Sequence, residues 1–220
     1  MNFPPQEKAH LTSDTKAVAR ELLRMKCVQF NLQSPYSWVS GIQSPIYCDN
    51  RKINSFVDGR RVVLNAFSRL ISEKFPDVQL IAGVATGGIP MGVMAAYQLE
   101  KPFVYVRLEP KKHGLKQQVE GSFSEGDKAV LIEDHVSTGG SSVKAIKGMQ
   151  ESKIKVQCII SIMTYGFLES VEKFNACAVA HYSLTDLDTV LDVAVEMNIL
   201  KPSEREAILR FRAAPQDWNP

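Results

Sequence analysis

Apolar runs and segments of helical period alternate along the second half of this chain of 220 residues. Short continuous apolar runs, such as residues 130–132, are typical of strands buried on both faces. Between them, apolar residues recur three and four positions apart, which indicates helices with one buried face. The pattern predicts strands near 79–84, 103–107, 129–133, 155–164 and 177–182, with helices near 90–99, 140–150 and 167–174. This alternation predicts an α/β fold with a mostly parallel central sheet flanked by helices.

Further helices are expected at both ends of the chain. Ser13 is a suitable cap for a first helix, and a second apolar stripe predicts a helix over 57–75, which Pro76 terminates. Two closing helices are expected near 186–197 and 202–210. The length suits one domain with a sizeable core, so we expect residues 1–220 to form a single domain.

Composition narrows the classes of function. The net charge of +2 is too small for a nucleic-acid footprint, and no apolar stretch reaches the length of a membrane span. The first twelve residues lack a basic-then-apolar signal sequence, which favours a cytoplasmic protein. Widely spaced cysteines predict reduced, packed thiols rather than zinc ligands or disulfides: Cys27, Cys48, Cys158 and Cys177.

An apolar strand, two carboxylates and a glycine-rich turn follow one another between residues 130 and 142. Glu133 and Asp134 fall at the expected carboxyl end of the strand, where open α/β sheets bind ligands. Ionised carboxylates only accept hydrogen bonds, so their natural partners are sugar hydroxyls or a metal ion. Adjacent strand residues point to opposite faces, so we expect the strand to end between or just after this pair. The turn then offers backbone N–H groups and hydroxyls to a phosphate at a helix N-terminus: Ser137, Thr138, Gly139, Gly140 and Ser141.

Two further segments suit an anionic ligand. Residues 81–90 form a glycine turn between a strand and a helix, but Ile89 and Pro90 stand where a nucleoside-triphosphate loop needs Lys and Ser or Thr. We expect the backbone N–H groups of residues 85–88 to face the anion. Residues 107–116 form a cationic loop, whose basic side chains are Arg107, Lys111, Lys112, His113 and Lys116.

These three segments resemble the type I phosphoribosyltransferases, which use a strand, an acidic pair and a Thr-Gly-Gly loop to bind phosphoribosyl pyrophosphate. The resemblance implies Mg²⁺ as cofactor, with no protein ligand for the metal assigned. It also implies that Thr86 and Gly87, together with the acidic pair and the turn after it, bind phosphoribosyl pyrophosphate. Arg107, Lys111, His113 and Asp134 would be catalytic. His135 stands where this family usually carries an apolar residue, so we expect it to pack or to act through a neighbouring residue, with no catalytic part.

A fourth segment, residues 40–51, reads Ser-Gly-x-x-Ser-Pro-x-Tyr-x-Asp-x-Arg. It is similar to the base-binding hood strand of the orotate branch of that family, which implies that about residues 1–55 form an N-terminal helix and hood. A planar anion such as orotate suits a stacking aromatic, Tyr47, and a guanidinium, Arg51. The resemblance adds Thr138 to this base site. Some orotate enzymes have lysine and phenylalanine where this chain has Val39 and Cys48, and some have an arginine after the strand that ends near 164.

The resemblance implies that the chain transfers the ribose 5-phosphate group of phosphoribosyl pyrophosphate to N1 of orotate. The products would be pyrophosphate and orotidine 5′-monophosphate, in the synthesis of UMP. The expected partners are these two small molecules and a second copy of the chain. In the resulting homodimer, the loop of residues 107–116 would close over the neighbouring site as a lid. We expect no nucleic-acid or membrane partner.

Two alternatives stay open at this point. One is a phosphoribosyltransferase that acts on another base, and the hood motif argues against it. The other is a regulatory protein of the same fold that senses phosphoribosyl pyrophosphate. Such a sensor is free to lose its basic lid residues, which this chain keeps.

The lid generates a first prediction. Replacing Lys111 by alanine should lower the turnover number by roughly 10²-fold, because this cation would neutralise the departing pyrophosphate. Steady-state kinetics, with the melting temperature as a folding control, measure this effect. An unchanged turnover number would remove Lys111 from the role.

Overall fold

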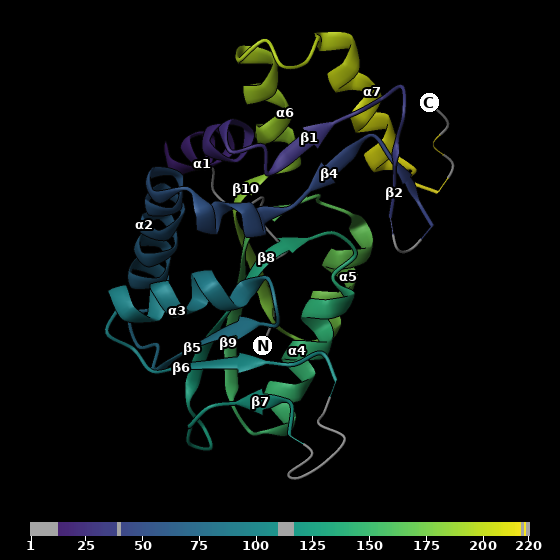
Figure 1. Ribbon diagram of the computed structural model, residues 1–220. Coiled ribbons are helices and arrows are strands. Elements are labelled where there is room, and N and C mark those ends of the chain that lie inside the picture. Colours follow the sequence, from purple (N-terminus) through teal and green to yellow (C-terminus); the bar gives the residue numbers. More distant parts are fainter. Residues whose placement is uncertain (1–12, 39–40, 110–116, 217, 219–220) are drawn as a thin grey trace.

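The computed structural model describes residues 13–38, 41–109, 117–216 and 218. At its centre lies a six-stranded sheet in the order β10-β9-β8-β5-β6-β7 (Figure 1). The strands are β5 (Leu80–Val84), β6 (Phe103–Val106), β7 (Val119–Glu120), β8 (Lys128–Val136), β9 (Lys155–Thr164) and β10 (Ala180–Asp186). All neighbouring pairs are parallel except β6 and β7. The expected α/β fold with a mostly parallel sheet is confirmed.

Helices cover both faces of this sheet (Figure 1). Helices α2 (Val57–Lys74) and α3 (Gly88–Gln98) share a core with Val130 and Ile132 of β8. Leu131, between those two residues, packs with helix α4 (Gly140–Glu151) on the opposite face, where α5 (Leu168–Ala176) also lies. Alternate side chains of a strand point to opposite faces, so a strand covered on both sides needs an unbroken apolar run.

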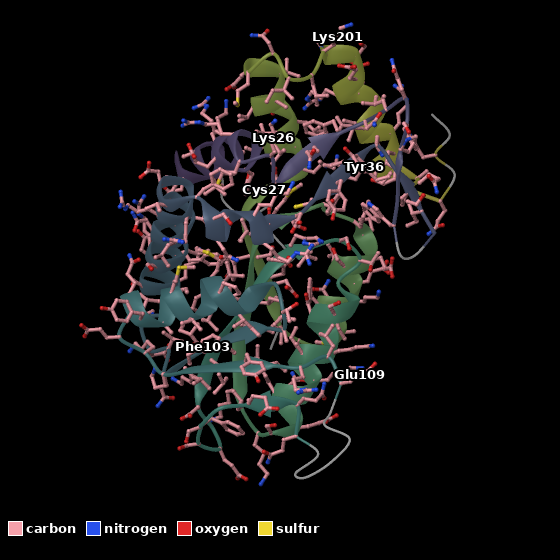
Figure 2. The ribbon with its side chains drawn as sticks, viewed as in Figure 1. Lys26, Cys27, Tyr36, Phe103, Glu109 and Lys201 are labelled. Atoms are coloured by element: carbon pink, nitrogen blue, oxygen red, sulfur yellow. The ribbon has the colours of Figure 1, made fainter. Side chains whose placement is uncertain are left out.

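A cap of smaller elements sits at the end of the molecule toward which the parallel strands run (Figure 1). Strands β1 (Val28–Phe30) and β4 (Ile46–Cys48) pair antiparallel, as do β2 (Tyr36–Ser37) and β3 (Gln43–Ser44). We call residues 28–55 the hood; it ends in the 3₁₀ helix η1 (Asn50–Ser55). Three helices flank the hood: α1 (Ser13–Arg24), α6 (Leu187–Glu196) and α7 (Pro202–Ala213). Tyr36 and Lys201 mark this end in Figure 2, whereas Phe103 marks the sheet.

An aromatic cluster joins the hood to the C-terminal helix. The Trp38 ring lies edge-on to Tyr165, Phe167 and Phe211, with centroid separations of 5.3, 6.3 and 5.9 Å. Phe211 belongs to α7, and its ring also contacts Trp218 at 5.6 Å. Edge-to-face pairs at these separations add to the stabilisation from buried area, so α7 helps to fix the position of the hood.

Three expectations from the sequence were wrong in detail. The strand that carries Glu133 and Asp134 does not end there, because β8 continues to Val136. The sequence predicted no strand between residues 107 and 129, but β7 lies there and pairs with β6 through Tyr105–Glu120 and Val106–Val119. A two-residue strand is too short for hydrophobic alternation to reveal. The last strand lies at 180–186 instead of 177–182.

Candidate active site

The site forms where β5 stops and its neighbour β8 continues. The two strands pair only from Leu80–Ala129 to Gly83–Ile132, whereas β8 and β9 stay paired as far as Val136–Thr164. Beyond Ile132, therefore, one edge of β8 is not paired with a strand. The turn that follows β5 occupies this edge, and the two carboxylates lie beside it.

Two glycines let this turn pack directly on β8. A Cβ atom on Gly88 would lie 2.3 Å from the carbonyl oxygen of Ile132, and one on Gly87 would lie 2.4 Å from Oδ2 of Asp134. Both separations are shorter than a real Cβ contact allows, so only glycine permits the approach. The packing brings residues from the ends of two different strands to one place.

A hollow of about 300 Å³ lies between this turn and the turn after β8. Its lining includes every residue that the sequence assigned to phosphoribosyl pyrophosphate: Thr86, Gly87, Glu133, Asp134, Ser137, Thr138, Gly139, Gly140 and Ser141. It also includes His135 and Ser142, which the sequence analysis did not assign to the site. The two carboxylates and the turn after β8 therefore line the same hollow.

The two carboxylates have different environments. Glu133 is only 5% exposed; its Oε2 accepts a hydrogen bond from Ser142 Oγ at 3.2 Å, and its Oε1 accepts one from the backbone N–H of Asp134 at 3.0 Å. Burial, and then the neighbouring Asp134 charge, raise the pKa of Glu133 well above its usual value. Burial also acts to raise the pKa of Asp134, but contact with His135 outweighs it and lowers the pKa. Asp134 is thus the carboxylate that stays ionised.

The turn after β5 offers fewer free donors than expected. The N–H of Ala85 donates to the carbonyl of Val106 at 2.9 Å, so it does not face the hollow as an anion donor. The expectation for residues 85–88 was wrong at this position because the turn stays attached to β6. Thr86 and Gly87 still line the hollow.

Helix α5 packs against the turn of residues 137–140 that follows β8. Lys173 Nζ donates to the carbonyl of Thr138 at 3.1 Å. Gly139 has a φ of +76° and lies against Ser170 and Phe174, where an added Cβ would be 3.4 Å from the Ser170 Cβ. These contacts hold the turn in a conformation that favours glycine.

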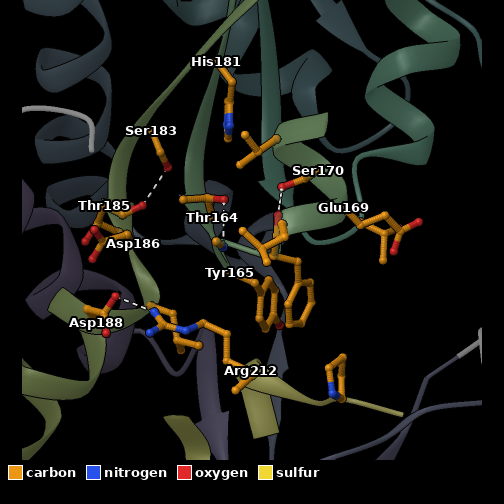
Figure 3. Close-up of a pocket in the computed structure, with 18 of the residues that line it drawn as sticks. Thr164, Tyr165, Glu169, Ser170, His181, Ser183, Thr185, Asp186, Asp188 and Arg212 are labelled. Atoms are coloured by element: carbon orange, nitrogen blue, oxygen red, sulfur yellow. Dashed lines mark hydrogen bonds and ion pairs between the residues drawn. The ribbon is translucent and has the colours of Figure 1, made fainter. Parts of the chain in front are cut away.

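A larger hollow of about 840 Å³ lies behind this turn, between α5, the end of β10 and α7 (Figure 3). Its carboxylates are Glu169, Asp186 and Asp188, and the last of these pairs with Arg212. Of the nine residues that the sequence assigned to phosphoribosyl pyrophosphate, this lining contains Thr138, whereas the lining of the smaller hollow contains all nine. The smaller hollow is therefore the candidate site for phosphate.

The hood contacts the site through Asn50. Its Nδ2 donates to the backbone carbonyl of Asp134 at 2.8 Å. Tyr47 and Arg51, which the sequence assigned to orotate, are not among the residues that line the smaller hollow. The Tyr47 ring lies 5.4 Å from Tyr36, and Arg51 Nε donates to Asp49 Oδ1 at 2.7 Å. The hood thus holds an aromatic pair and an ion pair beside the site.

The cationic loop is described only in part. Arg107 follows β6, and its Nη1 lies 3.8 Å from Glu120 Oε1. Figure 2 marks Glu109, the last residue of this loop that the structure describes. Lys111 and His113 lie outside the described residues, so their roles stay predictions.

Comparison with known proteins gives the family. The family model for the phosphoribosyl transferase domain matches residues 55–189. The orotate phosphoribosyltransferase of Bacillus subtilis is 41% identical over 203 residues, which are 91% of this chain and 94% of that protein. The one from Cytophaga hutchinsonii is 38% identical over 93% of this chain and 98% of its own length. The chain belongs to the orotate phosphoribosyltransferase family.

Solved structures agree with this membership at the level of fold. The orotate phosphoribosyltransferase of Aeropyrum pernix matches with a TM-score of 0.69 and 27% identity, over 80% of this chain and 97% of that one. Leishmania donovani UMP synthase gives 0.78 at 22% identity, over 90% of this chain and 42% of that one. The adenine phosphoribosyltransferase of L. donovani gives 0.64 at 22% identity, over 86% of this chain and 87% of that one. The fold is thus shared by enzymes that act on different bases.

Two further features were sought in this member of the orotate phosphoribosyltransferase family: a membrane-spanning helix and a group of metal-ligating side chains. Within the described residues, no helix has the length and apolar character needed to cross a membrane. Within the same residues, no three or more His, Cys, Asp or Glu side chains are grouped to hold a metal ion.

The Gly87 contact generates a prediction. Gly87→Ala should lower the turnover number by about 10²-fold, because its Cβ would displace the Asp134 carboxylate and misplacement by about 1 Å has that effect. Gly126→Ala is the matched control: its Cβ meets nothing within 4 Å, but its φ is +89°. The control should lose about 1 kcal/mol of stability and keep its kinetic constants. Equal turnover numbers in the two variants would contradict the role given to Gly87.

The raised pKa of Glu133 predicts a stability change that depends on pH. Above the ordinary carboxyl pKa, the buried side chain must either keep its proton or ionise at a cost, so the folded state loses stability as pH rises toward the folded pKa. Glu133→Gln removes the titrating group and with it this loss of stability. At pH 8 the melting temperature should rise by about 2–4 °C for each kcal/mol gained in the free energy of unfolding, whereas at pH 4 it should hardly change. The exposed Glu125→Gln should show no such trend. A gain for Glu133→Gln that is equal at both pH values would exclude titration of Glu133 as the cause.

Proposed function

We propose that this chain is an orotate phosphoribosyltransferase that joins orotate to phosphoribosyl pyrophosphate. The observation that carries the proposal is the shared hollow. It combines an acidic pair, suited to sugar hydroxyls, with a glycine turn at the N-terminus of α4, suited to phosphate. Identity of about 40% to orotate phosphoribosyltransferases over most of the chain supports orotate as the base.

The geometry suggests a division of labour around the sugar. Asp134, and Glu133 behind it, would accept hydrogen bonds from the ribose hydroxyls, while Thr138 and its neighbours would donate to the 5′-phosphate. N1 of orotate then forms a bond to C1′, the bond from C1′ to pyrophosphate breaks, and the N1 proton leaves. An ionised carboxylate close to the sugar also stabilises positive charge that develops at C1′.

The leaving pyrophosphate requires positive charge. Arg107, Lys111 and His113 are the basic residues proposed to supply it, from a lid that closes over the site of a partner subunit in a homodimer. Closure of such a lid would also keep water away from the reactive sugar.

Mg²⁺ would enter with the substrate. The grouping of acidic side chains is too small to hold the ion alone within the described residues, so hydroxyl and pyrophosphate oxygens of the substrate would provide most ligands. The bound ion would supply charge neutralisation at the pyrophosphate. We also propose that the enzyme acts in the cytoplasm in pyrimidine nucleotide synthesis.

A direct assay tests the proposed function. The loss of orotate absorbance is followed in purified protein with phosphoribosyl pyrophosphate and Mg²⁺, and with each component omitted in turn. Orotate should disappear only when all are present, with one pyrophosphate formed per orotate consumed. A protein that binds phosphoribosyl pyrophosphate and consumes adenine or uracil but no orotate would overturn the choice of base; binding without transfer to any base would indicate a sensor.

A further inference from the structure

His135 occupies a position that the function described so far does not use. It follows Asp134 in β8, where the sequence suggested a packing role, but its side chain is 31% exposed and lines the smaller hollow. Its Nδ1 is buried and lies 3.2 Å from Asp134 Oδ1, an ion-pair distance without the alignment of a good hydrogen bond. The exposed part of the ring is therefore the edge that carries Nε2.

Charged groups approach this imidazole from two elements. Asp134 lies beside it on β8, and the hood contributes the pair of Asp49 and Arg51. The Tyr165 ring, beyond β9, lies 6.3 Å away and edge-on, and it supplies no charge. Two carboxylates against one guanidinium favour the protonated imidazole. Burial acts to lower the pKa of His135, but contact with Asp134 outweighs it and the pKa is raised.

The chemistry of orotate gives this cation a function. The carboxylate of orotate is attached to C6, the ring atom next to the reacting N1. A group that recognises it must therefore lie close to the ribose site, and His135 lies directly beside Asp134. Arg51 is less well placed, because it is 61% exposed and its Nε is already bound to Asp49.

We propose that His135 is a specificity-determining residue whose imidazolium binds the C6 carboxylate of orotate. This inference rests on the proposed function. Asp134 holds the ring by its Nδ1 side and leaves the Nε2–H free to donate to the base. The chain has Val39 and lacks an arginine directly after Thr164, so neither position supplies a cation for the carboxylate.

Two nucleotides, the product of the proposed reaction and its analogue without the carboxylate, test this proposal by binding alone. Orotidine 5′-monophosphate and uridine 5′-monophosphate share the ribose phosphate and differ only in the C6 carboxylate. Calorimetry on the full-length wild type, His135→Val and Arg51→Ala gives six dissociation constants, with melting temperature as the folding control. His135→Val should raise the dissociation constant of orotidine monophosphate about tenfold, which is the effect of losing one charged hydrogen bond. The dissociation constant of uridine monophosphate should change by less than about twofold.

Each other outcome contradicts the proposal. An equal loss of affinity for both nucleotides would mean that His135 acts on the ribose site, through Asp134, and not on the base. A selective effect of Arg51→Ala alone would assign the carboxylate to Arg51, and no change in His135→Val would leave it a packing residue. His135→Asn, which keeps a hydrogen-bond donor, separates loss of function from misfolding: it should retain part of the preference for the carboxylate.

The pH dependence provides a second readout. A raised pKa means that the cation is present below that pKa and is lost as pH rises through it, so the preference for orotidine monophosphate should decline in the wild type. His135→Val should show no such decline, and a decline of equal size would contradict the proposal. A wild type without any preference for the carboxylate would instead contradict the proposed function itself.

Discussion

The site depends on a difference in length between two neighbouring parallel strands. Strand β8 continues four residues beyond its last pair with β5, and those residues are Glu133, Asp134, His135 and Val136. If β5 were equally long, its backbone would cover this edge of β8. Because it stops, a turn with two adjacent glycines can pack there, close enough to touch Asp134.

This segment of β8 is also the point where the other elements of the site meet. Helix α4 contacts it through Ser142, the hood through Asn50, and β9 through continuous pairing as far as Thr164. Each contact satisfies a buried or half-buried polar group, as burial of a carboxylate requires. Burial and the neighbouring His135 determine which carboxylate ionises: burial raises the pKa of Glu133, whereas contact with His135 lowers the pKa of Asp134. Two adjacent acidic residues thereby gain different properties from their surroundings.

The sequence predicted the sheet, most helices and the residues that line the smaller hollow because each leaves a local pattern. Buried strands appear as apolar runs, and phosphate turns as glycines and hydroxyls before a helix. It failed where the determining contact is distant in sequence. The end of β8 was placed too early because polar residues after Ile132 look like the start of a loop, whereas pairing with β9 extends the strand. Ser142 and Asn50 were missed because a single serine or asparagine carries no pattern. For His135 the sequence allowed packing or an action through its neighbours, because nothing in the sequence shows which way its ring points.

The central claim is that the extended end of β8 binds the ribose of phosphoribosyl pyrophosphate through Asp134. Calorimetric titration of phosphoribosyl pyrophosphate with Mg²⁺ into the wild type and Asp134→Asn, in the absence of base, tests it most directly. The Asp134→Asn variant should bind phosphoribosyl pyrophosphate at least about tenfold more weakly, because an amide accepts on one atom only and carries no charge. An equal dissociation constant in the two proteins, both shown to be folded, would contradict it.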